Sequence, residues 1–200
     1  QPLYTRYYIP EGNTSPINQD LDLTYSKHFV LGYSHQLNKN FGIKAEAYYQ
    51  DLTGIPIEMD SSAFSLTNAG SGFARVFPNA LNNNGTGYNY GIELTVQRYF
   101  NKNWHALFSG CLYNSQYTPS DGIERNTSFN GIYAANFLAG REFEVGKNKV
   151  LGLGVKVTGA GGKRKGIVDH VESAEQGEVI FLDEGFNAVS YTHLRAHETE

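Results

Sequence analysis

Apolar and polar residues alternate along most of this chain with a period of two. The alternation is clearest over 41–50, 90–98, 133–144 and 151–158, it is looser over 29–37, and 104–117 is strand-like without a clear division into faces. Such a pattern is typical of strands with an apolar surrounding on one side and a polar one on the other. The sequence therefore predicts an all-β protein with about six strands of roughly 10–13 residues, which is longer than the usual 5–6.

The strand lengths and the connections favour a membrane barrel. A strand tilted by about 45° needs roughly 9–11 residues to cross a bilayer. Short connections at 38–40, 101–103 and 146–149 alternate with long ones at 53–87, 118–130 and 161–186. Short turns at one end and long loops at the other are typical of outer-membrane barrels. We therefore expect an antiparallel up-and-down transmembrane β-barrel segment.

Aromatic residues lie near both ends of the expected strands. Tyr and Phe favour strands of any kind, but here their positions follow the loop asymmetry, as membrane-interface girdles would. The expected girdle residues are Phe41, Tyr49, Tyr90, Phe100, Trp104, Tyr133 and Phe143.

The residues on the opposite face of the expected strands are polar and would line a wet lumen. Its residues include Lys44, Glu46, Gln50, Glu93, Thr95, Gln97, Asn136, Glu142, Glu144 and Lys156. About six strands with polar inner faces indicate a large barrel with room for a channel or a plug.

Composition excludes several classes of protein. A mean hydropathy of −0.42, with no apolar run near 18 residues, excludes a transmembrane helix. The single cysteine, Cys111, excludes an internal disulfide and a cysteine-rich zinc site. The net charge of −4 gives no reason to expect a nucleic-acid partner.

No motif carries recognisable chemistry. The stretch 159–165 lacks the spacing of a phosphate loop, and His193 and His197 are weak candidates for a metal pair. A barrel hydrolase would need a serine and a histidine, but the spacing singles out none of the histidines. We therefore predict no enzyme, no catalytic residue, no metal site and no cofactor.

The two ends of the chain are unusual. The sequence begins at Gln1 without an initiator Met or a signal peptide, which favours a fragment or a processed product. The last residues differ in style from the rest and resemble an adapter-derived tail. We therefore assign 1–187 to a partial barrel and expect 188–200 to be a non-native tail.

Several strings, taken in order, resemble one family. They are AEAYYQDL at 45–52 with IPI at 55–57, YGIELT at 90–95, DGIERNT at 121–127, NFLAGREF at 136–143 and GGKR at 161–164. Together they resemble the C-terminal barrel of TonB-dependent outer-membrane receptors, in the branch with a carboxypeptidase-regulatory-like N-terminal domain. The resemblance covers about residues 3 to 187.

The resemblance implies a function and partners. The family forms a 22-stranded barrel closed by a plug, in the outer membrane of Gram-negative bacteria. It imports a scarce ligand, such as an iron–siderophore complex, cobalamin or a glycan, with energy from the TonB complex. The plug and the segment that meets the TonB complex are absent from this sequence, and we do not expect the fragment to transport alone.

Ligand specificity would then lie in the long loops and on the lumen face. The candidate contacts are Arg75, Phe77, Tyr117, Arg125, Lys163 and Arg164. A passive porin-like or structural barrel is the alternative function, and a soluble β-sandwich that binds a ligand is a third possibility. The sequence does not identify the ligand.

Overall fold

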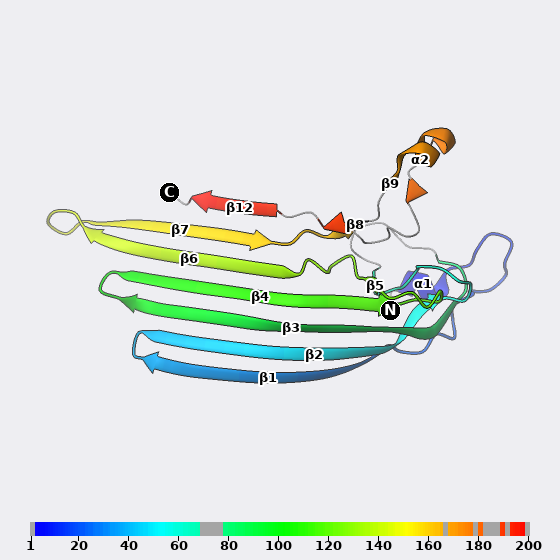
Figure 1. Ribbon diagram of the computed structural model, residues 1–200, viewed down its shortest axis with the longest axis horizontal. Coiled ribbons are helices and arrows are strands. Elements are labelled where there is room, and N and C mark those ends of the chain that lie inside the picture. Colours follow the sequence, from blue (N-terminus) through cyan, green and yellow to red (C-terminus); the bar gives the residue numbers. More distant parts are fainter. Residues whose placement is uncertain are drawn as a thin grey trace.

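One antiparallel sheet dominates the chain (Figure 1). The computed structural model describes residues 3–68, 78–165, 168–177, 180–181, 189–190 and 193–198. The eight-stranded sheet has the order β1-β2-β3-β4-β6-β7-β12, with β5 paired to β4. Its strands are β1 (Tyr25–Asn38), β2 (Phe41–Glu58), β3 (Leu81–Asn101), β4 (Trp104–Thr118), β5 (Arg125–Asn126), β6 (Tyr133–Glu144), β7 (Val150–Ala160) and β12 (His193–Glu198).

The remaining elements are small. They are α1 (Leu3–Tyr7), α2 (His170–Gln176), and the paired two-residue strands β8 (Arg164–Lys165) with β11 (Val189–Ser190) and β9 (Val168–Asp169) with β10 (Ile180–Phe181). None of the described helices is long and apolar enough to span a membrane. The all-β prediction is confirmed, and the sheet is open, with β1 and β12 at its edges.

Four strands are longer than the sequence indicated. β1 to β4 contain 14, 18, 21 and 15 residues. β2 and β3 stay paired as far as Glu58 and Leu81, across two bulges, so the prediction of a loop over 53–87 was wrong at both ends. Asn and Gly are rare in strands, so their presence here favoured a loop. In the structure, the Asn83 amide donates to the Gly54 carbonyl at 2.7 Å and holds this part of the hairpin together.

The register confirms the two faces. Ala45 pairs with Leu94, Leu94 with Gly110, and Gly110 with Ala135, so residues of one parity form a continuous apolar face. The register also assigns β4, whose faces the sequence left open, because Phe108 pairs with both Val96 and Phe137. The polar residues predicted to share a face do so.

The apolar face is uncovered, and the buried core lies elsewhere. Leu31, Ile92 and Leu153 are 78%, 57% and 58% exposed. The buried apolar residues of the described chain include Leu21, Ile55, Ile57, Leu81 and Tyr117, which all belong to the long-loop end. The sheet is thus a single layer, and the packed core of the described chain lies at its long-loop end.

The short turns gather at one end of the sheet, as predicted. Figure 1 shows the β1–β2, β3–β4 and β6–β7 turns together, opposite the long connections. In the β3–β4 turn, Lys102 and Asn103 have φ of 51° and 64°. Two consecutive residues with positive φ are typical of the tight turn whose twist matches antiparallel strands.

β12 lies within the segment expected to be a non-native tail. Its backbone pairs with β7 from His193 opposite Ala160 to Glu198 opposite Val155. Backbone pairing does not depend on where a sequence came from, so the boundary at 187 stays a prediction.

Candidate functional site

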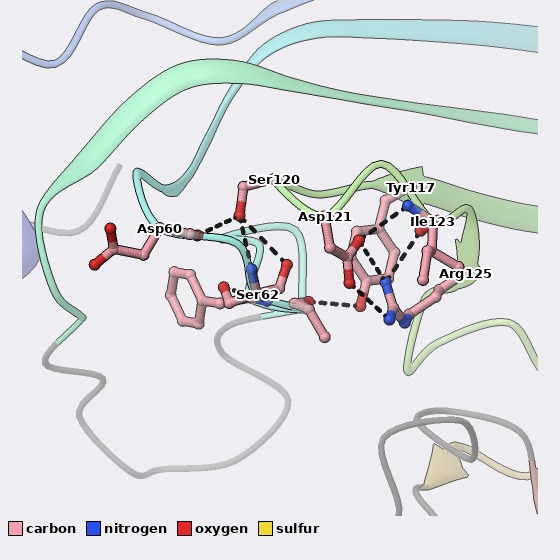
Figure 2. A network of polar contacts seen from close by, with 9 residues as sticks. Asp60, Ser62, Tyr117, Ser120, Asp121, Ile123 and Arg125 are labelled. Atoms are coloured by element: carbon pink, nitrogen blue, oxygen red, sulfur yellow. Dashed lines mark hydrogen bonds and ion pairs between the residues drawn. The ribbon is translucent and has the colours of Figure 1, made fainter.

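The long connections meet in a polar network at one end of the sheet (Figure 2). Ser120 joins the β4–β5 connection to the β2–β3 loop. Its hydroxyl donates to the Asp60 carbonyl at 2.6 Å and accepts from the Ser62 amide at 3.0 Å. We call the residues 59–68 and 117–132 the loop cluster. Its two loops are far apart in sequence and are held together by hydrogen bonds.

Tyr117 lies at the centre of the loop cluster. It is 0% exposed, and its hydroxyl donates to the Ala63 carbonyl at 3.0 Å. Burial raises the pKa of the phenol to about 12, because the charged form loses its hydration. In this arrangement Tyr117 contacts protein on all sides, and its predicted contact with a ligand stays untested.

Asp121 and Arg125 form a bidentate ion pair within the loop cluster. The guanidinium Nη1 lies 2.9 Å from Oδ1 and Nη2 lies 2.7 Å from Oδ2, and the side chains of Arg125 and Asp121 are only 11% and 15% exposed, respectively. The Ile123 amide also donates to Oδ1 at 2.9 Å. These hydrogen bonds lower the pKa of Asp121, and the one from Arg125 has the largest effect. Arg125 therefore fixes the turn that Gly122 makes with a φ of 74°.

An asparagine network, which the sequence did not predict, supports the end of the cluster. Asn130 is 1% exposed, and its amide donates to Asn114 Oδ1 at 2.6 Å and to Asn126 Oδ1 at 2.7 Å. Asparagine is common in any turn, so sequence offered no signal that separated these residues from the other asparagines.

Arg164 and Lys163 lie against the same cluster. The Arg164 Nε donates to the Asn130 carbonyl at 2.9 Å. The Lys163 Nζ lies 5.6 Å from the centre of the Phe129 ring, and the side chain is exposed. The structure thus brings four of the predicted ligand contacts to one end of the molecule. Arg75 and Phe77 lie outside the described residues.

A hollow of about 440 Å³ opens on the polar face below the loop cluster. Glu46 and Glu93 face each other across β2 and β3 and both line it. Lys44 Nζ lies 2.6 Å from Glu46 Oε2. The other lining side chains include Tyr48, Gln50, Asn89, Tyr113 and Phe129. Carboxylates, amides and aromatic rings together suit a cationic or polyhydroxylated group.

The expected girdle residues divide between the two ends of the sheet. Tyr49 pairs with Tyr90 toward the long loops, and Trp104 lies at the short turns opposite Arg141. Tyr133 and Phe143 share this outer parity, as does Phe41.

Phe100 departs from the expected girdle. A bulge between Arg98 and Asn101 places two β3 residues opposite one β4 residue. The Phe100 ring instead lies 6.2 Å from the ring of His105, whose partner is Gly140 of the polar face. The alternation of the sequence did not reveal this bulge.

Comparison of the chain with protein-family models, with curated proteins and with solved structures gives no match. Among the described residues, no group of three or more His, Cys, Asp or Glu could hold a metal ion. The features of the described chain that bear on function are the two faces and the two ends of the sheet.

Proposed function

We propose that this chain is part of the barrel of a TonB-dependent receptor in the outer membrane of a Gram-negative bacterium. The receptor takes up a scarce ligand, such as an iron–siderophore complex, cobalamin or a glycan. The observation that carries the membrane part of this proposal is the uncovered apolar face.

Lipid is the surrounding that suits this face. Phe29, Leu31 and Tyr33 on β1, and Leu151, Leu153 and Val155 on β7, all leave between about two fifths and four fifths of their surface exposed. Apolar surface in water costs about 25 cal/mol per Å², and a continuous patch across six strands is far larger than soluble monomers tolerate. The paired strands also satisfy the backbone groups that a bilayer cannot.

The dimensions and the ends of the sheet support the same proposal. Strands of 11 to 21 residues reach or exceed the roughly 9–11 that a tilted strand needs to cross the hydrocarbon. The short turns would face the periplasm and the loop cluster the outside. Trp104 and Phe143 would lie at one interface and Tyr49, Tyr90 and Tyr133 at the other.

The polar face supports a wide, filled lumen. Two carboxylates that face each other, as those of Glu46 and Glu93 do, are costly in lipid and do not fit the tightly packed interior of a narrow barrel. A plug domain in another part of the same reading frame would cover this face, and the TonB complex would act through that plug. The ordered sequence strings favour this energised receptor over a passive barrel, and we assign it no enzymatic role.

The membrane part is tested by labelling adjacent residues of β7. Val155 belongs to the apolar face and Lys156 to the polar face. In a Cys111→Ser background, a fluorophore on Val155→Cys should be quenched by nitroxide-bearing lipids, and one on Lys156→Cys should not. The complete protein in vesicles is the sample. Equal quenching at both positions, or a complete protein that stays in solution without detergent, would contradict the proposal.

The transport part is tested in the host cell. A plug-domain sequence in the complete reading frame, and growth on a ferric siderophore, cobalamin or glycan that requires both this gene and the TonB complex, would support it. Uptake that continues without the TonB complex would favour a passive barrel instead.

A further inference from the structure

The short-turn end of the sheet carries a concentration of positive charge. Each of the short turns contains lysine, and two arginines lie just inside them on the apolar face. These cations are Lys39, Arg98, Lys102, Arg141, Lys147 and Lys149. The carboxylates of this end, Glu142 and Glu144, pair with Gly152 and Val150 and so belong to the polar face. The outward surface of this end is therefore cationic.

The long-loop end has the opposite balance. Its carboxylates in the described chain include Asp20, Asp22, Asp51, Glu58, Asp60, Asp121 and Glu124. The basic residues there are partly engaged by them, as Arg125 is by Asp121. The charge asymmetry thus follows the axis along which the strands run.

Trp104 organises the arginines of the apolar face. The Arg98 guanidinium carbon lies 3.8 Å from the centre of the Trp104 ring, and Nη2 donates to the Asn101 carbonyl at 3.3 Å. Arg141 is the cross-strand partner of Trp104 and lies 4.9 Å from the Phe143 ring. Stacking on aromatic rings holds both guanidinium groups at the boundary of the apolar face, where a charge on the lipid side costs little.

An open hollow of about 600 Å³ lies beside Trp104. Lys102 and Arg141 form its charged rim, and Ala139, Leu153 and Val155 form its apolar floor. The hollow therefore offers cations toward the turns and hydrocarbon toward the middle of the sheet. A phosphate with an attached acyl chain has the same two parts in the same order.

We propose that this hollow binds one anionic phospholipid, with its phosphate between Lys102 and Arg141 and an acyl chain along Leu153 and Val155. Charged hydrogen bonds from a guanidinium to phosphate are among the strongest polar contacts in proteins. The surface charge favours an anionic lipid over a zwitterionic one. The proposal rests on the membrane location proposed above and adds a specific lipid partner at one interface.

Native mass spectrometry of the complete protein, purified from membranes in detergent, tests the proposal with phosphatidylglycerol and phosphatidylcholine as probes. We expect selective retention of phosphatidylglycerol. The double substitution Lys102→Gln/Arg141→Gln should weaken this binding about 10- to 30-fold, because each cation near an anionic lipid surface contributes roughly fivefold.

Matched variants separate lipid binding from folding. Lys27→Gln/Lys156→Gln removes two charges elsewhere and should leave binding unchanged, whereas Arg141→Lys keeps the charge and should stay within about threefold of wild type. A heat-modifiable band in cold gels checks that each variant is folded.

Two kinds of failure are distinguishable. Equal retention of both lipids, an equal loss in both double variants, or a dimer peak without lipid overturns the lipid site while the protein remains membrane-embedded. A complete protein that needs no detergent overturns the membrane location itself.

Discussion

Glycines of the polar face let larger neighbours lie flat across the sheet. Tyr48 is the cross-strand partner of Gly91, and a Cβ on Gly91 would stand 2.8 Å from the Tyr48 hydroxyl and 2.7 Å from the Leu112 carbonyl oxygen. His105 covers Gly140 in the same way, with its ring 2.5 Å from where a Cβ would be. These glycines make room for a ring, a role distinct from freedom in φ.

Gly91→Ala is expected to lower the free energy of unfolding by about 1–3 kcal/mol, because the methyl group would displace Tyr48 or separate two strands. Gly152→Ala is the matched control, since nothing lies within 4 Å of a Cβ there. Urea titration of the complete protein in vesicles measures both. An equal change in the free energy of unfolding for the two variants would show that the Tyr48 ring does not lie against Gly91.

Tyr117 is expected to ionise at a higher pH than a tyrosine in water. Its pKa is raised from 10.0 to about 12, so the unfolded chain releases this proton before the folded chain does. The stability that the neutral phenol contributes is therefore complete below pH 10 and is lost as the pH rises through about 12.

The difference in tyrosinate absorbance between wild type and Tyr117→Phe should contain this late transition. Tyr113→Phe on the same strand serves as the control. A difference spectrum that titrates near pH 10 would mean that Tyr117 is accessible to water.

At the scale of elements, tight turns and bulges set the register. The β3–β4 turn holds Lys102 and Asn103 at positive φ, and the adjoining bulge turns Phe100 to the polar face. At the other end, the paired extension of β2 and β3 carries the N-terminal segment. Asn18 there accepts from the Leu81 amide at 2.7 Å and donates to the Asn79 carbonyl at 3.2 Å.

The β3–β4 turn predicts opposite effects for two substitutions. Asn103→Gly should leave stability unchanged or raise it by up to about 1 kcal/mol, because glycine adopts positive φ without strain. Asn103→Val should lower it by about 1–2 kcal/mol, since a β-branched residue is strained there. Urea midpoints in vesicles test this order, and equal midpoints would argue against the turn conformation.

For the molecule as a whole, the open sheet limits what this chain does alone. β1 presents a 14-residue edge whose outer side has no partner among the described strands. Unpaired backbone groups each cost several kcal/mol in hydrocarbon. The described residues form no second layer on this sheet, so an open sheet would leave apolar side chains in water or unpaired backbone groups in lipid.

The 200-residue chain is therefore expected not to insert stably by itself. After refolding with vesicles, alkaline extraction should release it, whereas the complete protein should remain in the membrane. A heat-modifiable, membrane-floated product from this chain alone would contradict the expectation and would indicate closure through self-association.

The sequence by itself determined the two faces, the all-β class and the alternation of short and long connections. These are local properties, because parity along a strand follows from the backbone period alone. The membrane location, the receptor family and the ligand contacts stay predictions.

Only the tertiary structure decided where β2 and β3 end, where the bulge lies and what the loops hold. Asn83 and Ser120 cannot be told from ordinary loop residues in the sequence, since polar residues are common in any loop, and for Arg125 the sequence predicts a ligand contact. Asn83 donates a hydrogen bond to a backbone carbonyl about 30 residues away, and Ser120 donates one to a backbone carbonyl about 60 residues away. Arg125 pairs locally with Asp121, and the pair is largely buried. Long-range contacts such as those of Asn83 and Ser120 do not recur at a fixed spacing, so no pattern along the chain predicts them.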